Sequence, residues 1–325
     1  MRKVAWAFLL VLVLGTGALA APEYTLKLGH LANESHTWHL GATRFAEAVE
    51  RLSGGRIACK VYANEQLGKE MELISGIQTG VVHMTITGES MQNWAPKCAL
   101  IAVPYMLRDL DHEVAVVDGE IGKEIEAQII EKVQVRPIAW FARSPRNLTS
   151  NRPIAKPEDL NGLKMRVPNV PLFVAVWQAL GAKPTPMAFS EVFTSLQQNV
   201  IEGQENPVDL IRSATLYEVQ SHINLTEHVY GWIYLVIGEQ FFQKLPDDLK
   251  DAVLQAGKEA QAYERELWAA DVEANEKFLA EKGMTFVEVD KPAFAKIAQP
   301  VVEDFFKDKP EVLELYKKIV KMGEK

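Results

Sequence analysis

The chain is poor in cysteine and, beyond its first residues, has no long apolar run. The two cysteines, Cys59 and Cys98, either pair in an oxidising compartment or remain buried free thiols, and the sequence leaves both readings open. No later stretch approaches the roughly 18 consecutive apolar residues that a membrane-spanning helix needs. We therefore expect a protein that works outside the bilayer.

Basic residues are also in the minority. The 325 residues include 35 Lys and Arg against 43 Asp and Glu, a formal charge of −8. This balance argues against nucleic acid as a partner, because nucleic-acid binding requires basic patches. An anionic ligand would have to be captured by a local basic pocket and not by the overall field of the protein.

Sequence motifs of the common enzyme classes are missing. The chain has no HExxH, CxxC, GxSxG, GxGxxG or Walker pattern. Four residues that could bind a metal ion lie close together in the N-terminal part of the sequence: His30, Glu34, His36 and His39. They lack the ordered spacing of a catalytic zinc site. A secreted hydrolase built on an unfamiliar constellation is the remaining enzymatic alternative, and the favoured reading is a protein that is not an enzyme.

The N-terminus has the three parts of a secretory signal. Basic residues at positions 2 and 3 precede an apolar run from Val4 to Leu14, and an Ala-Leu-Ala-Ala stretch ends at Ala21. We expect residues 1–20 to be a cleaved signal peptide and the mature protein to be periplasmic. Losing Arg2 and Lys3 leaves 33 basic against 43 acidic residues, a charge of −10.

Strand and helix patterns alternate along the first half. This alternation predicts an α/β fold with parallel strands. Strands are expected at 24–30, 56–62, 81–87 and 133–141, and helices at 39–52, 69–80 and 121–132. A stretch rich in Ser, Pro, Asn and Arg at 143–160 predicts a passage into a second domain.

The second half continues the alternation and then becomes helical. Strands are expected at 163–167, 200–204 and 228–237, and helices at 171–180 and 191–198. Residues 247–281 predict one long helix or a bent pair, with Pro246 before it and Gly283 after it. At 1.5 Å per residue, this segment would span roughly 50 Å, enough to cross two domains.

Arg166 is the most informative single residue. It lies where an apolar strand pattern ends at Pro168. A permanently charged side chain at such a position needs an anionic partner, and its planar fork matches a carboxylate. That partner is either an internal carboxylate or the carboxylate of an organic acid.

The residues around Arg166 belong to a series of motifs. Motifs in this order run through nearly the whole mature chain: LGHLANESHTWHLGATRFAEAVERLSGGRI (28–57), NEQLGKEMELISGIQTGVVHM (64–84), GLKMRVPN (162–169), GAKPTPMAFSEVFTSLQQNVIEGQEN (181–206), YEVQ (217–220) and LPDDLKDAV (245–253). In these motifs and their order, the chain resembles the substrate-binding proteins of tripartite ATP-independent periplasmic (TRAP) transporters.

The resemblance implies a two-lobed type II periplasmic-binding-protein fold, with a ligand cleft between the lobes and a long helix spanning both. We expect lobe I at 21–143 plus 232–271 and lobe II at 144–231 plus 272–325. The ligand would be a small organic acid, with a sugar acid such as a uronate or aldonate favoured and a C4-dicarboxylate next.

The same resemblance implies how the protein works. A monomer without a cofactor would deliver the acid to membrane permease subunits driven by an ion gradient. The alternative is a periplasmic sensor that reports the ligand to a membrane receptor, since both would use the same cleft.

The resemblance also implies positions for the ligand contacts. Arg166 would clamp the ligand carboxylate, and Asn206 would bond to the same group. Arg146 is the best match to a second clamp arginine, with Arg143 as the alternative. Phe189 would place an aromatic ring against the ligand.

Further candidates come from expected loop positions. Glu70 and Glu34 would accept hydrogen bonds from sugar hydroxyls, or else they are solvated acids at helix starts. Asp209 is a similar case, three residues after Asn206. Either Trp232, the favoured candidate, or Tyr234 is expected to stack on a sugar face.

Overall fold

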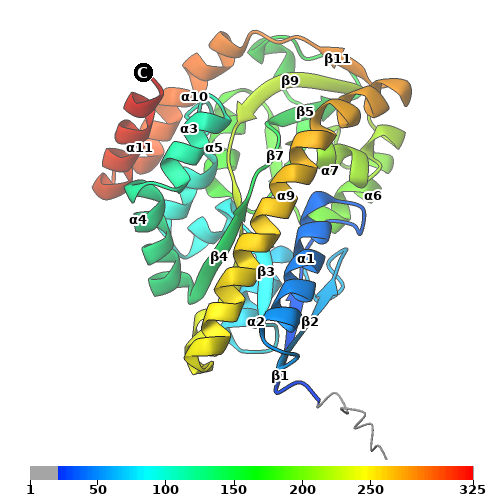
Figure 1. Ribbon diagram of the computed structural model, residues 1–325. Helices are drawn as coiled ribbons and strands as arrows, with labels where there is room; N and C mark the ends of the chain where they lie inside the picture. The colour runs from blue at the N-terminus through cyan, green and yellow to red at the C-terminus, as the bar shows by residue number, and fades with distance from the viewer. Residues whose placement is uncertain (1–20, 325) are drawn as a thin grey trace, which may run out of the picture.

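The computed structural model describes residues 21–324, so the expected signal peptide at 1–20 lies outside the described residues. The strands form two separate sheets, with helices around them (Figure 1). The first sheet has the order β2 (Ile57–Tyr62), β1 (Tyr24–Gly29), β3 (Met84–Thr87), β10 (Ile233–Gly238), β4 (Val135–Phe141). The second has the order β11 (Thr285–Val287), β9 (His222–Val229), β5 (Arg146–Ser150), β8 (Gly203–Pro207), β6 (Lys164–Val167), β7 (Lys183–Pro186).

The helices connect and cover these strands. The α-helices are α1 (Thr37–Leu52), α2 (Glu70–Gln78), α3 (Leu110–Val117), α4 (Glu120–Gln128), α5 (Pro171–Ala179), α6 (Val192–Gln197), α7 (Val208–Ser213), α8 (Glu239–Lys244), α9 (Asp247–Glu281), α10 (Lys291–Phe306) and α11 (Pro310–Gly323). Short 3-10 turns are η1 (Glu89–Asn93), η2 (Pro96–Ala102), η4 (Pro157–Leu160), η5 (Phe189–Glu191) and η6 (Leu216–Glu218), and a π-turn, η3 (Ile129–Val133), follows α4.

Helix α1 shows how the local sequence determines where a helix begins, which side of it is buried and where it ends. The side chain of His36 accepts a hydrogen bond from the backbone N–H of Trp38 at 3.1 Å and so caps the helix start. Phe45 and Val49 are four residues apart, and both are fully buried against the first sheet. Beyond the helix end, Gly54 has a φ of 64°, a left-handed conformation that glycine adopts without strain.

Strand direction corrects one expectation. The pairs β1–β2, β1–β3, β6–β7, β6–β8 and β9–β11 are parallel, as predicted. Strand β10 instead runs antiparallel to β3 and β4, and β5 runs antiparallel to β8 and β9. The alternation of side chains fixes which face of a strand is buried, but it carries no information on direction. The expectation of parallel strands therefore holds for five strand pairs and was wrong for the four pairs that involve β10 or β5.

Three element boundaries also differ from the sequence prediction. The expected strand at 228–237 is the junction of two strands, β9 and β10, which belong to different sheets. The expected break at 143–160 contains strand β5. The strand expected at 200–204 lies at Gly203–Pro207 as β8, while residues 247–281 form a single continuous helix.

Two short backbone segments cross from one sheet to the other. Residues 142–145 join β4 to β5, and residues 230–232 join β9 to β10. The side chain of Arg143 ties them together, because its Nε donates to the carbonyl oxygen of Gly231 at 3.0 Å. A Cβ atom on Gly231 would lie 2.3 Å from the carbonyl oxygen of Ile101, so this position has no room for a side chain.

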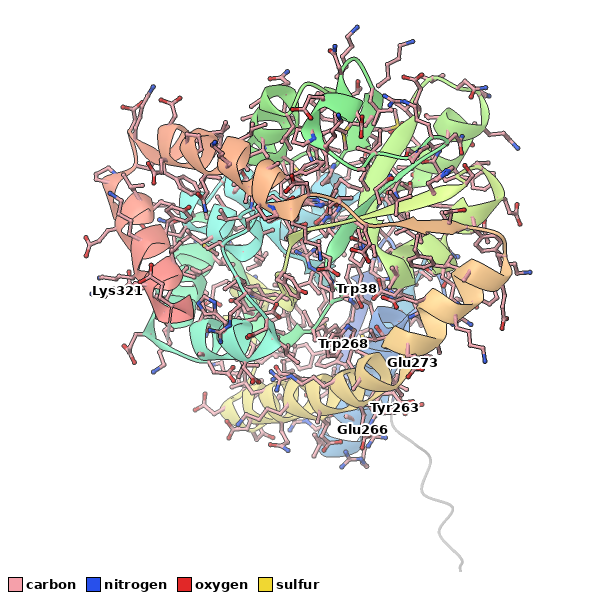
Figure 2. All side chains as sticks on the ribbon, turned by 90° about the horizontal axis from the view of Figure 1, so that it is seen from above. Trp38, Tyr263, Glu266, Trp268, Glu273 and Lys321 are labelled. Atoms are coloured by element: carbon pink, nitrogen blue, oxygen red, sulfur yellow. The ribbon has the colours of Figure 1, made fainter. Side chains whose placement is uncertain are left out.

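Helix α9 runs along both sheets, from the region of β4 and α1 to that of α7 (Figure 1). Its inner side carries Trp268, whose indole Nε1 donates to Ser144 Oγ at 3.2 Å, and its outer side carries Glu266 (Figure 2). Gly257 lets the helix approach β4 closely, since a Cβ there would lie 2.4 Å from the Ile138 carbonyl oxygen. The predicted helix spanning both lobes is confirmed.

The two cysteines do not pair in this structure. Both Cys59 and Cys98 are free, the first in β2 and the second in η2. Burial raises the pKa of Cys59 to about 12 and raises that of Cys98 as well, so neither thiol is activated.

A separate result concerns membrane insertion. Within residues 21–324, no helix combines the length and the apolar character that crossing a bilayer requires.

A buried carboxyl group lies where α9 packs on α1. Glu264 is fully buried, and Thr37 Oγ1 donates to its Oε1 at 2.9 Å. Its other oxygen has no hydrogen-bond partner in the described part of the chain. Burial raises the pKa of Glu264 to about 8, although the Thr37 hydroxyl opposes this rise.

This raised pKa makes stability depend on pH. Glu264 holds its proton more tightly in the folded than in the unfolded chain. Its contribution to the free energy of unfolding is therefore complete below pH about 4 and is lost as the pH rises to about 8. We expect Glu264→Gln to match the wild type in unfolding free energy at pH 5 and to exceed it by a few kcal/mol at pH 9. Urea unfolding at both pH values measures this difference. The exposed Glu273→Gln on the same helix should show no such change, and a pH-independent effect of Glu264→Gln would contradict the assignment.

Candidate ligand-binding site

A cavity of about 380 Å³ lies between the two sheets and receives side chains from both. We call it the inner cavity. Its lining residues are Leu31, Trp38, Glu70, Glu89, Ser90, Arg143, Arg146, Arg166, Pro168, Phe189, Asn206, Leu210 and Ile233.

Arg166 projects from β6 into this cavity as a buried cation. Its exposed fraction is 4%, its Nε donates to the Met187 carbonyl oxygen at 2.9 Å, and its guanidinium lies 5.8 Å from the ring centroid of Phe189. Among residues 21–324, no carboxylate oxygen lies within 4.0 Å of its nitrogen atoms. Burial lowers the pKa of Arg166 to about 10, so it remains charged at neutral pH. A buried cation without a counterion is costly, and the cavity therefore favours an incoming anion.

Arg146, on β5, lines the same cavity but already has a partner. Its Nε lies 2.5 Å from Glu205 Oε2, and its Nη2 donates to Glu205 Oε1 at 2.8 Å. This two-point pairing uses the planar fork of the guanidinium. Nη2 also donates to Asn206 Oδ1 at 3.2 Å, so the pair fixes the orientation of this amide.

The backbone segment 142–145 brings a third arginine to the cavity wall. Arg143 Nη1 donates to Glu89 Oε1 at 3.0 Å, and Arg146 Nη1 lies 3.6 Å from the same oxygen. Arg143 Nη2 is buried without a hydrogen-bond partner in the described structure. Both candidates for the second clamp arginine therefore line the cavity, with Arg146 tied to Glu205 and Arg143 tied to the crossover segments.

The arginines determine which carboxyl groups are ionised. Burial opposes ionisation of Glu89 and Glu205, but the nearby guanidinium groups outweigh it. Arg143 and Arg146 hold the pKa of Glu89 below its ordinary value, and Arg146 brings that of Glu205 to about 2. These two carboxylates offset the charges of Arg143 and Arg146, which leaves Arg166 as the unbalanced cation.

Glu70 differs from Glu89 and Glu205 in the direction in which its pKa is shifted. It accepts hydrogen bonds from Thr87 Oγ1 at 2.7 Å and from Ser90 Oγ at 3.0 Å. Burial, together with the negative charge of Glu89, raises the pKa of Glu70. A half-buried carboxyl group set among hydroxyl groups can form hydrogen bonds with the hydroxyls of a ligand.

The structure brings five of the eight candidate residues together in the inner cavity, namely Arg166, Arg146, Asn206, Phe189 and Glu70.

The other three candidates do not line the inner cavity. Glu34 is exposed, and Asp209 faces a different pocket, where its Oδ2 lies 3.7 Å from His36 Nε2. Trp232 is fully buried and packs edge-on against Tyr234, while its neighbour Ile233 reaches the cavity.

Sequence reasoning missed three polar groups of the cavity wall. Glu89 and Ser90 lie two and three residues after the end of β3, and a search of strand ends would have found them. Trp38, in the first turn of α1, is 2% exposed, and its indole N–H has no hydrogen-bond partner in the described residues (Figure 2). No local pattern marks this tryptophan as different from a core residue.

Comparisons with known proteins agree on the family. Residues 28–309 match the family model of bacterial extracellular solute-binding protein, family 7. A solute-binding protein of Roseobacter denitrificans is 60% identical over 292 residues, which cover 90% of each chain. The 2,3-diketo-L-gulonate-binding periplasmic protein YiaO of Escherichia coli is 30% identical over 98% of each chain.

Solved structures share the fold. A TRAP periplasmic solute-binding protein from Roseobacter denitrificans with bound L-galactonate has a TM-score of 0.90 and 58% identity, covering 92% of this chain and 99% of that one. Another, from Sulfurospirillum deleyianum with bound succinate, has a TM-score of 0.86 and 31% identity, covering 92% and 98%. The two-lobed fold expected from the sequence is confirmed, and the chain belongs to the bacterial extracellular solute-binding protein family 7, the periplasmic binding proteins of TRAP transporters.

Proposed function

We propose that this protein captures a sugar acid, with a six-carbon aldonate favoured, and passes it to a TRAP permease. The observation that carries this proposal is the unpaired Arg166 in the inner cavity. The 58% identical relative with bound L-galactonate supports an aldonate. The 31% identical relative with bound succinate makes a C4-dicarboxylate the next candidate.

Binding begins with the carboxylate. Arg166 offers its two terminal nitrogens, which have no hydrogen-bond partner among the described residues, and a two-point contact with a carboxylate fits this fork. Arg146 and Asn206 complete the carboxylate site, held in orientation by Glu205. The buried position of these groups strengthens the attraction, because little water screens the charges.

The hydroxyl groups of the ligand are bound at a second group of residues. Ser90 Oγ donates to Glu70 Oε2 at 3.0 Å, and both residues line the same cavity. The indole N–H of Trp38 and the Nη2 of Arg143 are buried donors without partners in the described chain. Unsatisfied buried donors favour a ligand rich in oxygen, which supports a polyhydroxy acid over succinate.

Ligand capture is coupled to closure of the lobes. We assign residues 21–143 and 232–271 to lobe I and residues 144–231 and 272–325 to lobe II, a division supported by the membership of the two sheets. The segments 142–145 and 230–232 act as the hinge. A ligand that contacts both lobes binds the closed state better and so shifts the population toward it.

The remaining steps follow from the family. Residues 1–20 direct export and are removed, and the mature monomer works in the periplasm. The closed, loaded form is what the permease recognises, and an ion gradient drives uptake. The protein itself catalyses no reaction.

Thermal unfolding of the mature protein tests the function directly. L-Galactonate, galacturonate and succinate are compared with galactitol, which keeps the hydroxyls of galactonate but has no charge. An acid at 100 times its dissociation constant should add about 2.7 kcal/mol to stability and raise the midpoint by several degrees. We expect the largest shift with galactonate and none with galactitol. Equal shifts for galactonate and galactitol, or no shift with any acid before and after refolding, would contradict the proposal.

Arg166→Lys tests the carboxylate contact. Lysine keeps the positive charge but loses the two-point fork, so affinity for galactonate should fall at least tenfold, or about 1.4 kcal/mol. Isothermal titration calorimetry measures this change. The exposed Arg152→Lys serves as the matched control and should bind like the wild type. Unchanged affinity in Arg166→Lys would remove this residue from the ligand site.

Glu70→Gln tests the contact with hydroxyl groups. The amide replaces one acceptor oxygen by a donor, so the variant should bind galactonate more weakly while its affinity for succinate changes little. The ratio of the two dissociation constants is the readout, and the exposed Glu34→Gln is the control. A proportional loss for both ligands would make Glu70 a purely structural acid.

A further inference from the structure

We infer that His36 and Asp209 form a hydrogen bond that stabilises the closed, ligand-bound protein, and we call this pair the latch. The inference rests on the proposed function and adds two positioning residues outside the inner cavity. His36 directly precedes α1, in the connection from β1 of the first sheet. Asp209 lies in the first turn of α7, which follows β8 of the second sheet. The pair therefore spans the two proposed lobes.

Each member of the latch has a buried polar atom without a partner. The exposed fraction is 3% for His36 and 7% for Asp209. His36 Nε2 and Asp209 Oδ2 have no hydrogen-bond partner in the described part of the chain, and they lie 3.7 Å apart. This distance exceeds the ordinary upper limit of a hydrogen bond to nitrogen by roughly 0.5 Å. A small further approach of the lobes would satisfy both atoms at once.

The other polar atoms of the pair determine which one donates. His36 Nδ1 accepts a hydrogen bond from the backbone N–H of Trp38 at 3.1 Å. In the neutral ring the proton is therefore on Nε2, the atom that faces Asp209. Asp209 Oδ1 accepts a hydrogen bond from the backbone N–H of Leu210 at 2.7 Å, which leaves Oδ2 free to accept one from His36. The latch thus sets a donor opposite an acceptor.

Neighbouring groups do not compete for this carboxylate. Among residues 21–324, His36 is the basic residue with a nitrogen atom within 4.0 Å of Asp209. Arg212 lines the same polar pocket of about 440 Å³, but its Nη1 donates to Asn275 Oδ1 at 3.0 Å. Its guanidinium lies 4.4 Å from the ring centroid of Phe278. Asp209 is therefore available to His36.

The latch is connected to the inner cavity on both sides. The imidazole of His36 packs edge-on against the indole of Trp38, with ring centroids 4.8 Å apart. Trp38 lines the inner cavity from the first lobe, and Leu210, which follows Asp209, lines it from the second. A ligand that contacts both Trp38 and Leu210 therefore brings the two latch residues closer together.

A second contact holds the same two segments in register. Asn33 Nδ2, three residues before His36, donates to the carbonyl oxygen of Ser213 at 2.5 Å. Ser213 is the last residue of α7, whereas Asp209 lies near its start. The connection between β1 and α1 thus meets α7 near both of its ends.

Asp209→Asn tests the latch with little change of shape. The amide oxygen can accept a hydrogen bond from Leu210 or from His36, but one of the two contacts is lost. Charge alone predicts equal or tighter binding of an anion, because the variant removes a nearby negative charge. We expect the affinity for L-galactonate to fall roughly fivefold or more in calorimetry instead. The dissociation rate, measured by stopped-flow tryptophan fluorescence, should rise accordingly.

Three further measurements separate the latch from a structural role. Asp271→Asn is the matched control: it removes the same charge from the same polar pocket and should not weaken binding. His36→Asn keeps a side-chain oxygen that can cap α1 but should weaken binding. Adding Asp209→Asn to His36→Asn should cause no further loss, because the two residues act through each other. The unfolding free energy of ligand-free Asp209→Asn should equal that of the wild type.

The outcomes distinguish failure of the latch from failure of the function. If the wild type binds none of L-galactonate, galacturonate and succinate, the proposed function fails. If galactonate does not bind but another of these acids does, the same comparisons are made with that acid. Equal or tighter binding by Asp209→Asn would show that the latch is wrong while the function stands. Additive losses in the double variant, or a matching loss of stability without ligand, would also overturn the latch.

Discussion

The free-energy cost of burying charged side chains determines how the charged groups between the two sheets are paired. Three guanidinium groups are gathered there in a chain whose formal charge is −8. Glu205 pairs with Arg146, and Glu89 pairs with Arg143, each within hydrogen-bonding distance. Buried ion pairs that are well hydrogen-bonded offset their desolvation, whereas an unpaired buried ion does not. Arg166 is the arginine without a carboxylate partner in the described structure. It gives the cavity a local positive charge that can attract an anion, although the net charge of the protein is negative.

The same charges connect the proposed ligand site to the two backbone segments that link the sheets. Glu89 lies just after a strand of the first sheet, whereas Arg146 belongs to the second, so their contact joins the lobes through the cavity wall. Arg143 extends this connection to the Gly231 carbonyl oxygen in the other crossover. In the proposed mechanism, ligand binding and closure of the lobes would therefore involve the same side chains.

The sequence was sufficient for features that depend on local patterns. The bounds of the 35-residue helix α9 were predicted, with a bent pair as the alternative. Arg166 was singled out as a charge at the end of an apolar strand, and the family resemblance favoured a ligand carboxylate over an internal one as its partner. Features that depend on distant partners could not be read in this way. The antiparallel directions of β5 and β10 depend on which strand lies beside them. The pairing of Arg146 with Glu205 links residues 59 positions apart, and Trp38 differs from a core tryptophan only through the cavity beside it.

The choice of ligand is a separate problem from the fold. Relatives with bound L-galactonate and bound succinate superimpose on this chain with TM-scores of 0.90 and 0.86, so the backbone scarcely distinguishes the two acids. The carboxylate contact does not distinguish them either, because every member of this ligand class carries that group. We therefore expect discrimination to come from the other polar groups of the cavity wall, among them Glu70 and Ser90. Because the proposed carboxylate anchor and the proposed hydroxyl contacts are different residues, Glu70 and Ser90 could change without disturbing the pairing of Arg146 with Glu205.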